Sequence, residues 1–168
     1  MGTKRVGMAR VKSVINENLN EMYLRKPKFR KFTETAELLA SESGQTILCG
    51  PLAAGLASDA TLTLPEAEQG LSFRIIYVGG AADTHDLIIR TGSDDNFFIG
   101  GLVQHDPTNG GDDTVTYHPN NSSNSKVTIL TPDSGTEVEC WCDGTNWFIA
   151  GRVISATATA VTFENTGG

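Results

Sequence analysis

The chain has 168 residues, of which 39% are hydrophobic and 20% are charged. This composition predicts one compact domain with an appendage, rather than two full domains or a disordered chain. The formal charge of −7 argues against a body that binds nucleic acid. No apolar run reaches the roughly 18 residues of a membrane span, and no apolar stretch follows the basic first residues, so we expect neither a transmembrane segment nor a secretory signal.

The charges divide the chain into two parts. Residues 1–32 hold nine Lys and Arg side chains against two Glu, a net charge of +7, whereas residues 33–168 have four cations against 18 acids, a net charge of −14. Such asymmetry indicates a basic arm attached to an acidic body. We therefore expect an arm over residues 1–40 and a β-sandwich domain over residues 41–168.

The arm begins with a predicted helix. Its apolar residues recur at steps of three and four, which places them on one stripe, and they include Val11, Val14, Ile15, Leu19 and Met22. An isolated helix of this length is marginal, so the stripe needs a partner. Pro27 ends the helix, because the residue before a proline is pushed toward extended geometry.

Basic and aromatic residues alternate after Pro27, from Lys28 to Phe32. This pattern is typical of segments that bind nucleic acid through phosphate contacts and stacking, but it also suits an extended strand that crosses an acidic protein surface. A solvated arm is the third reading. We expect a protein partner, and the candidate binding residues are Val11, Val14, Ile15, Leu19, Met22, Arg25, Lys26, Lys28, Phe29, Arg30, Lys31 and Phe32.

The segment 33–39 predicts either one helical turn or a short strand. Beyond it, short runs rich in β-branched residues are separated by turn residues, and ten of them predict strands: Thr46–Cys49, Ala60–Leu64, Leu71–Val78, Leu87–Thr91, Phe97–Val103, Thr114–Tyr117, Lys126–Thr131, Glu137–Cys142, Trp147–Ile154 and Thr157–Phe163. No helical pattern lies between them. The sequence thus predicts an all-β fold, an antiparallel sandwich or barrel.

Two local patterns refine this expectation. Asp143-Gly144 predicts a hairpin between Glu137–Cys142 and Trp147–Ile154, and the second strand, apolar on both faces, should be central in its sheet. Gly100-Gly101 inside a strand pattern predicts a bulge or a close backbone approach. Both tryptophans, Trp141 and Trp147, are expected to pack in the core.

Little in the sequence points to catalysis or to a metal. His85, His105 and His118 lie near acids or turns, but none accompanies a nucleophile motif, so we expect no enzyme and no cofactor. The acid clusters at 94–96 and 106–113 carry oxygen ligands of the kind that calcium takes, but their spacing does not match an EF-hand, so we expect solvated acidic turns and no metal. Cys49, Cys140 and Cys142 predict free, partly buried thiols, as in a reducing cytoplasm.

Three stretches resemble phage virion proteins. The opening MGTKRVGMARVKSVINENLNEM is similar to the start of small virion proteins of marine tailed phages. The stretches TLTLPEAEQGLSFRIIYVGG and VECWCDGTNWFIAGRV resemble β-domains of phage head decoration (cement) proteins and of some tail fibre proteins. The resemblance implies a jelly-roll-like subunit that forms a homotrimer on the capsid exterior, bound to the major capsid protein.

The expected function is therefore a structural virion protein, assembled in the host cytoplasm, whose basic arm grips the capsid while the acidic domain faces outward. No nucleic-acid or membrane partner is expected. The rival expectation is a tail fibre or host-surface-binding module, in which loops around Asp94, His105 and Asn120 would bind sugar.

Overall fold

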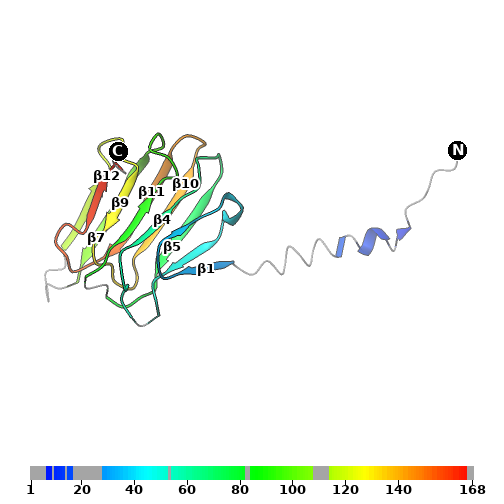
Figure 1. The fold of residues 1–168 in the computed structure, drawn as a ribbon. Coiled ribbons are helices and arrows are strands. Elements are labelled where there is room, and N and C mark those ends of the chain that lie inside the picture. Colours follow the sequence, from blue (N-terminus) through cyan, green and yellow to red (C-terminus); the bar gives the residue numbers. More distant parts are fainter. Residues whose placement is uncertain are drawn as a thin grey trace.

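The computed structural model describes residues 7–8, 10–13, 15–16, 28–52, 54–81, 84–107 and 114–165. Within them the chain forms two β-sheets, which confirms the all-β class (Figure 1). The elements are β1 (Phe29–Phe32), β2 (Ala36–Glu37), the 3-10 helix η1 (Ala40–Glu42), β3 (Thr46–Cys49), β4 (Ala60–Thr63), β5 (Ser72–Tyr77), β6 (Leu87–Arg90), β7 (Phe98–Asp106), β8 (Thr114–Pro119), β9 (Lys126–Ile129), β10 (Glu137–Cys142), β11 (Trp147–Ile154) and β12 (Val161–Glu164).

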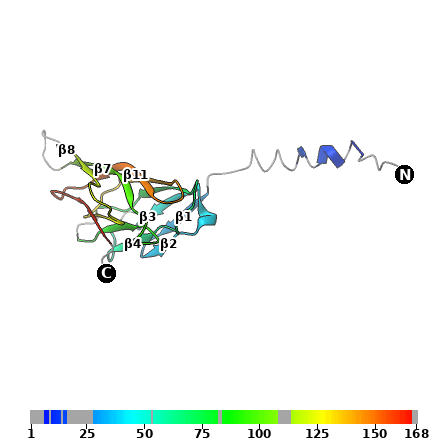
Figure 2. The same ribbon diagram turned by 90° about the horizontal axis from the view of Figure 1, so that it is seen from above.

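The strands divide into a seven-stranded sheet of order β1-β3-β5-β10-β11-β7-β8 and a five-stranded sheet of order β12-β9-β6-β4-β2. Seen from above, β7, β8 and β11 lie in one layer and β2 and β4 in the other (Figure 2). Side chains of both sheets, such as Ile47 and Ile75 of the first and Leu62 and Ile89 of the second, enter one hydrophobic core. Full burial of each such side chain contributes about 1.5–3 kcal/mol.

The expectation of purely antiparallel sheets is wrong, because the sheets are mixed. From β1 to β7 the chain alternates between them, with odd-numbered strands in one and even-numbered strands in the other. When the chain returns to a sheet after such a crossover, the new strand runs in the same direction as the previous strand of that sheet. Accordingly β1, β3 and β5 pair in parallel, as do β2, β4 and β6, and β7 also lies parallel to β11.

The predicted hairpin is confirmed. β10 and β11 pair antiparallel with Cys142 opposite Trp147, and β11 is central, between β10 and β7. The loop is held by the Asp143 carboxylate, which accepts hydrogen bonds of 2.8 Å from the backbone N–H groups of Thr145 and Asn146. These backbone donors stabilise the charged carboxylate and lower the pKa of Asp143.

Gly100 and Gly101 lie at a close backbone approach, as predicted. A Cβ on Gly100 would lie 2.3 Å from the carbonyl oxygen of Ile149, and one on Gly101 would lie 2.4 Å from that of His118. Gly100 also has a φ of +119°, a conformation that L side chains rarely adopt. The pair thus lets β7 fit between β11 and β8.

Sheet structure begins inside the segment 1–40 that the sequence assigns to the arm. β1 pairs with β3, and within residues 33–39 the two-residue strand β2 pairs with β4, while none of these residues is helical. Both strands precede the expected domain start at residue 41. Among the described residues, the sheets therefore begin at Phe29.

Candidate functional site

The described residues at the start of the chain are helical, as predicted. Residues 8, 10–13, 15 and 16 have helical backbone, and the N–H groups of Arg10 and Val11 donate to the carbonyl of Gly7 (blue in Figure 1). Val11 is 40% exposed and Ile15 is 50% exposed. These two apolar candidate residues are therefore accessible to a partner. The other predicted binding residues of this segment lie outside the described residues: Val14, Leu19, Met22, Arg25 and Lys26.

The remaining candidates form the edge of the seven-stranded sheet. The carbonyl of Lys28 accepts a hydrogen bond from the N–H of Thr46, and Phe29–Phe32 is the strand β1 itself. Phe29 and Lys31 point outward, whereas Phe32 is buried in the core. The alternation of exposed and buried positions is the signal that identifies the strand.

Arg30 is engaged within the domain. Its guanidinium forms an ion pair with Glu42 and donates a hydrogen bond of 2.9 Å to the carbonyl of Glu37. One of the cations assigned to the basic arm is thus partly neutralised by the body. Counted from Lys28 onward, the body has seven cations against 18 acids, a net charge of −11, and residues 1–27 keep a net charge of +4.

The outer face of the seven-stranded sheet carries a feature that sequence reasoning missed. Trp147 is buried as expected, but Trp141 is 43% exposed and stacks on Phe148, with ring centroids 5.9 Å apart and planes within 8°. The signal in the sequence is that Trp141 shares a strand face with Glu137 and Glu139, which is the face turned to solvent.

The strand register places four residues side by side across this face. Ser72 of β5 lies opposite Trp141 of β10, Trp141 lies opposite Phe148 of β11, and Phe148 lies opposite Ile99 of β7. We call this set the outer row. Ile99, like Trp141, is exposed.

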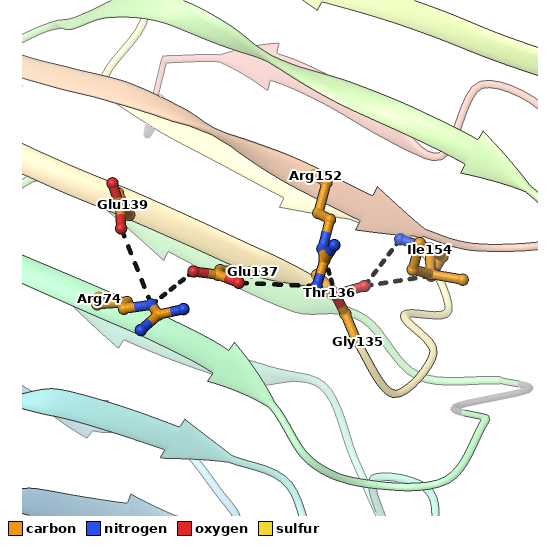
Figure 3. A network of polar contacts seen from close by, with 7 residues as sticks. All are labelled: Arg74, Gly135, Thr136, Glu137, Glu139, Arg152 and Ile154. Atoms are coloured by element: carbon orange, nitrogen blue, oxygen red, sulfur yellow. Dashed lines mark hydrogen bonds and ion pairs between the residues drawn. The ribbon is translucent and has the colours of Figure 1, made fainter.

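Next to the outer row lies a polar cluster of Arg74, Glu137, Glu139 and Arg152 (Figure 3). Arg74 Nε donates a hydrogen bond of 2.5 Å to Glu137 Oε1 and lies 3.8 Å from Glu139 Oε1. The hydrogen bond from Arg74 lowers the pKa of Glu137, since it favours the charged carboxylate. Two cations thus face two carboxylates, and the cluster has no net charge.

Two hollows flank the outer row. The first, of about 290 Å³, lies on the β3 and β5 side and is lined by Gln45, Thr46, Ser72, Arg74, Glu139 and Trp141 among others. The second, of about 350 Å³, lies on the β7 side and is lined by Ile99, Asn120, Asn121, Ser122, Ser123 and Asn146 with the two adjacent phenylalanines. Hydroxyl, amide and charged groups therefore surround an apolar centre.

The loops that the sequence offers for sugar binding use the side chains of Asp94 and Asn120 within the domain. Asp94 accepts a hydrogen bond of 3.1 Å from the hydroxyl of Ser125, and the Asn120 amide donates to the carbonyl of Phe98 at 2.7 Å. His105 lies within β7, opposite Val115 of β8. Most of the acidic loop 106–113 lies outside the described residues.

The other histidines have structural partners. His85 Nδ1 lies 3.5 Å from the Asp59 carboxylate, and His118 Nε2 lies 3.0 Å from the Gln104 side-chain oxygen. Burial lowers the pKa of His118. Among the described residues, no group of three or more His, Cys, Asp and Glu side chains is placed to hold a metal ion.

The cysteines are free and buried, which confirms that prediction. Desolvation by burial raises the pKa of Cys49 to about 12 and also raises the pKa of Cys140. Both thiols are therefore neutral at ordinary pH and pack as small apolar side chains.

Comparison with known proteins gives no assignment. No known family matches the sequence, and no curated protein resembles it significantly. In the described parts of the chain, no helix has the length and apolar character needed to cross a bilayer.

Proposed function

We propose that this protein is a capsid decoration (cement) protein of a tailed phage, of the marine type. It binds the major capsid protein on the outside of the head as a homotrimer and stabilises the shell. It is assembled in the host cytoplasm, performs no catalysis and resides on the virion exterior. The shared core of the two sheets supports a sandwich subunit, and its parallel pairs β1-β3-β5 depart from the antiparallel strands of the expected jelly-roll-like fold.

One observation carries the proposal: a cationic amphipathic segment with exposed Val11 and Ile15 precedes an acidic β-domain. The segment joins the domain at β1, the edge strand of the larger sheet. An appendage of opposite charge to its own body suits a protein that attaches at one end to an acidic shell.

Attachment of this kind stabilises a shell by mass action, because the protein binds assembled subunits and not unfolded ones. In a trimer, three weak segments act together. Once one has bound, the effective concentration of the other two at the shell rises, so avidity exceeds the affinity of a single segment.

The test is binding to heads of the phage that encodes the protein, prepared without it. Deletion should stop at residue 27, since removal of residues 28–32 would also destroy β1. We expect the 1–27 deletion and the double variant Val11→Asp, Ile15→Asp to bind at least tenfold more weakly than the full chain. Asn16→Ala, on the same helix, is the matched control.

Co-sedimentation measures the binding, and the melting temperature of the heads measures the cementing. Full-affinity binding by the 1–27 deletion would refute the role of the segment. A monomer in sedimentation velocity, both free and on heads, would refute the trimer.

The exposed Trp141 favours a second candidate, a tail fibre or host-surface-binding module, because an accessible aromatic ring suits recognition of a surface ligand. The copy number per virion separates the two. Many copies over the head support the decoration protein, and a few copies at the tail support the fibre.

A further inference from the structure

We propose that the outer row and its two hollows form a binding site for neutral oligosaccharides. The site lies on the outer face of the seven-stranded sheet, with the loop residues 120–123 and Asn146 at its β7 end, and not on the N-terminal segment. Sugar binding here is independent of the capsid attachment proposed above, because no residue of the site belongs to residues 1–32.

The open ring face of Trp141 is the first element of this site. Phe148 covers one face of the indole from β11, and on the other side, in β5, the residue opposite Trp141 is the small Ser72. The first hollow begins there, because Trp141 and Ser72 both line it. The C–H-rich face of a pyranose ring packs on an aromatic face of this kind, with its slightly positive hydrogens against the negative π face.

Polar groups beside the ring supply the hydrogen bonds that sugar hydroxyls need. Gln45, Thr46, Arg74 and Glu139 line the first hollow and include both donors and acceptors. A binding site with an aromatic floor and a few polar groups around it is the usual form of a small-ligand site. Fixed partners preorganise it, because Arg74 is held by Glu137 and Trp141 is held by Phe148.

The length of the site suits a chain of several sugars. The outer row crosses four neighbouring strands, or about 14 Å at three strand spacings. Beyond Ile99, the second hollow is lined by Asn121 and Ser122 and by Asn146, whose side-chain oxygen accepts a hydrogen bond of 3.1 Å from the N–H of Phe97. A linear oligosaccharide lying across the strands contacts an aromatic centre and hydrogen-bonding groups at both ends.

The charges favour a neutral ligand. Arg74 and Arg152 are both paired with carboxylates of the polar cluster, which has no net charge. An acidic glycan would place its negative charge next to Glu137 and Glu139, and both arginines of that cluster are already paired. The net negative charge of the body would also repel such a glycan.

An array of immobilised neutral and acidic glycans, probed with the full-length protein, tests the proposal. We expect binding to neutral hexose oligosaccharides, followed in solution by calorimetry and by a blue shift of tryptophan emission as Trp141 is covered. Trp141→Ala should weaken the affinity at least tenfold and abolish the shift. Ser72→Leu, which fills the space beside the intact ring, should weaken it similarly.

Tyr117→Ala is the matched control, since Tyr117 is an exposed aromatic on the same sheet that lines neither hollow. It should bind like the unchanged protein. The proposal is overturned by an array with no neutral ligand, by binding of acidic glycans alone, or by unchanged affinity in both Trp141→Ala and Ser72→Leu. It is also overturned if Trp141→Ala dissociates an oligomer, which would place the ring in a subunit interface.

Discussion

Gly100 shows how one residue type fixes the contact between two strands. Its positive φ and the nearby carbonyl of Ile149 both exclude a side chain. We expect Gly100→Ala to lower the free energy of unfolding by about 2–5 kcal/mol, the sum of a left-handed backbone cost and an overpacking cost. Urea unfolding measures the loss.

Gly44→Ala is the control for this prediction. Gly44 has a φ of +78°, but no atom lies within 4 Å of a Cβ built there. The free energy of unfolding of Gly44→Ala should fall by only about 1–2 kcal/mol, the cost of a side chain at a left-handed backbone position. Equal losses in the two variants would contradict the close approach between β7 and β11.

Cys49 makes stability depend on pH in the alkaline range. Its thiol has a pKa of about 12 in the fold, against about 8.5 in an unfolded chain. Above pH 8.5 the unfolded state loses this proton and the folded state keeps it, so stability falls as the pH rises, by about 1.4 kcal/mol per pH unit until about pH 12.

Urea titrations of the unchanged protein and of Cys49→Ala at pH 7 and pH 10 measure this effect. The variant should lose about 2 kcal/mol less than the unchanged protein between the two pH values. Parallel losses would mean that the Cys49 thiol already ionises in the folded chain.

At the scale of the element, β1 links the N-terminal segment to the core. We expect Phe32→Ala to lower the free energy of unfolding by about 3 kcal/mol or more, because Phe32 is buried, whereas Phe29→Ala on the exposed side should change it by less than about 0.5 kcal/mol. Thermal and urea unfolding of both variants test this contrast. A small effect for both would show that β1 is not part of the cooperative fold.

Strand positions could be predicted from sequence, whereas strand partners could not. β3, β10 and β11 have the predicted bounds, because alternation of apolar and polar residues reports which side chains face the core. The alternation of apolar and polar residues is the same whether a strand runs parallel or antiparallel to its neighbour. It therefore contains no information on the crossovers that make β1, β3 and β5 parallel.

At the scale of the whole molecule, composition predicted the division into a cationic segment and an acidic body but misplaced its boundary. Lys28 precedes β1, and Arg30 and Lys31 lie within it. These three cations therefore belong to the acidic body, although the sequence assigns them to the basic arm. Charge counts along a sequence cannot show this, since strand pairing with β3 is what assigns these residues to the sheet. The exposure of Trp141 follows from the strand face that it shares with Glu137 and Glu139, but its neighbours Ser72 and Phe148 on the adjacent strands are known only from the register.

The strand order also sets the sequence of events during synthesis. β1, β3 and β5 leave the ribosome before β10, the strand that covers the open edge of β5 and lies about 60 residues later in the chain. At about 5–20 residues per second this gap lasts several seconds. During that time the nascent sheet presents unpaired N–H and C=O groups along β5, where another nascent chain can pair with it. The larger sheet therefore becomes complete only when the β10–β11 hairpin inserts between β5 and β7.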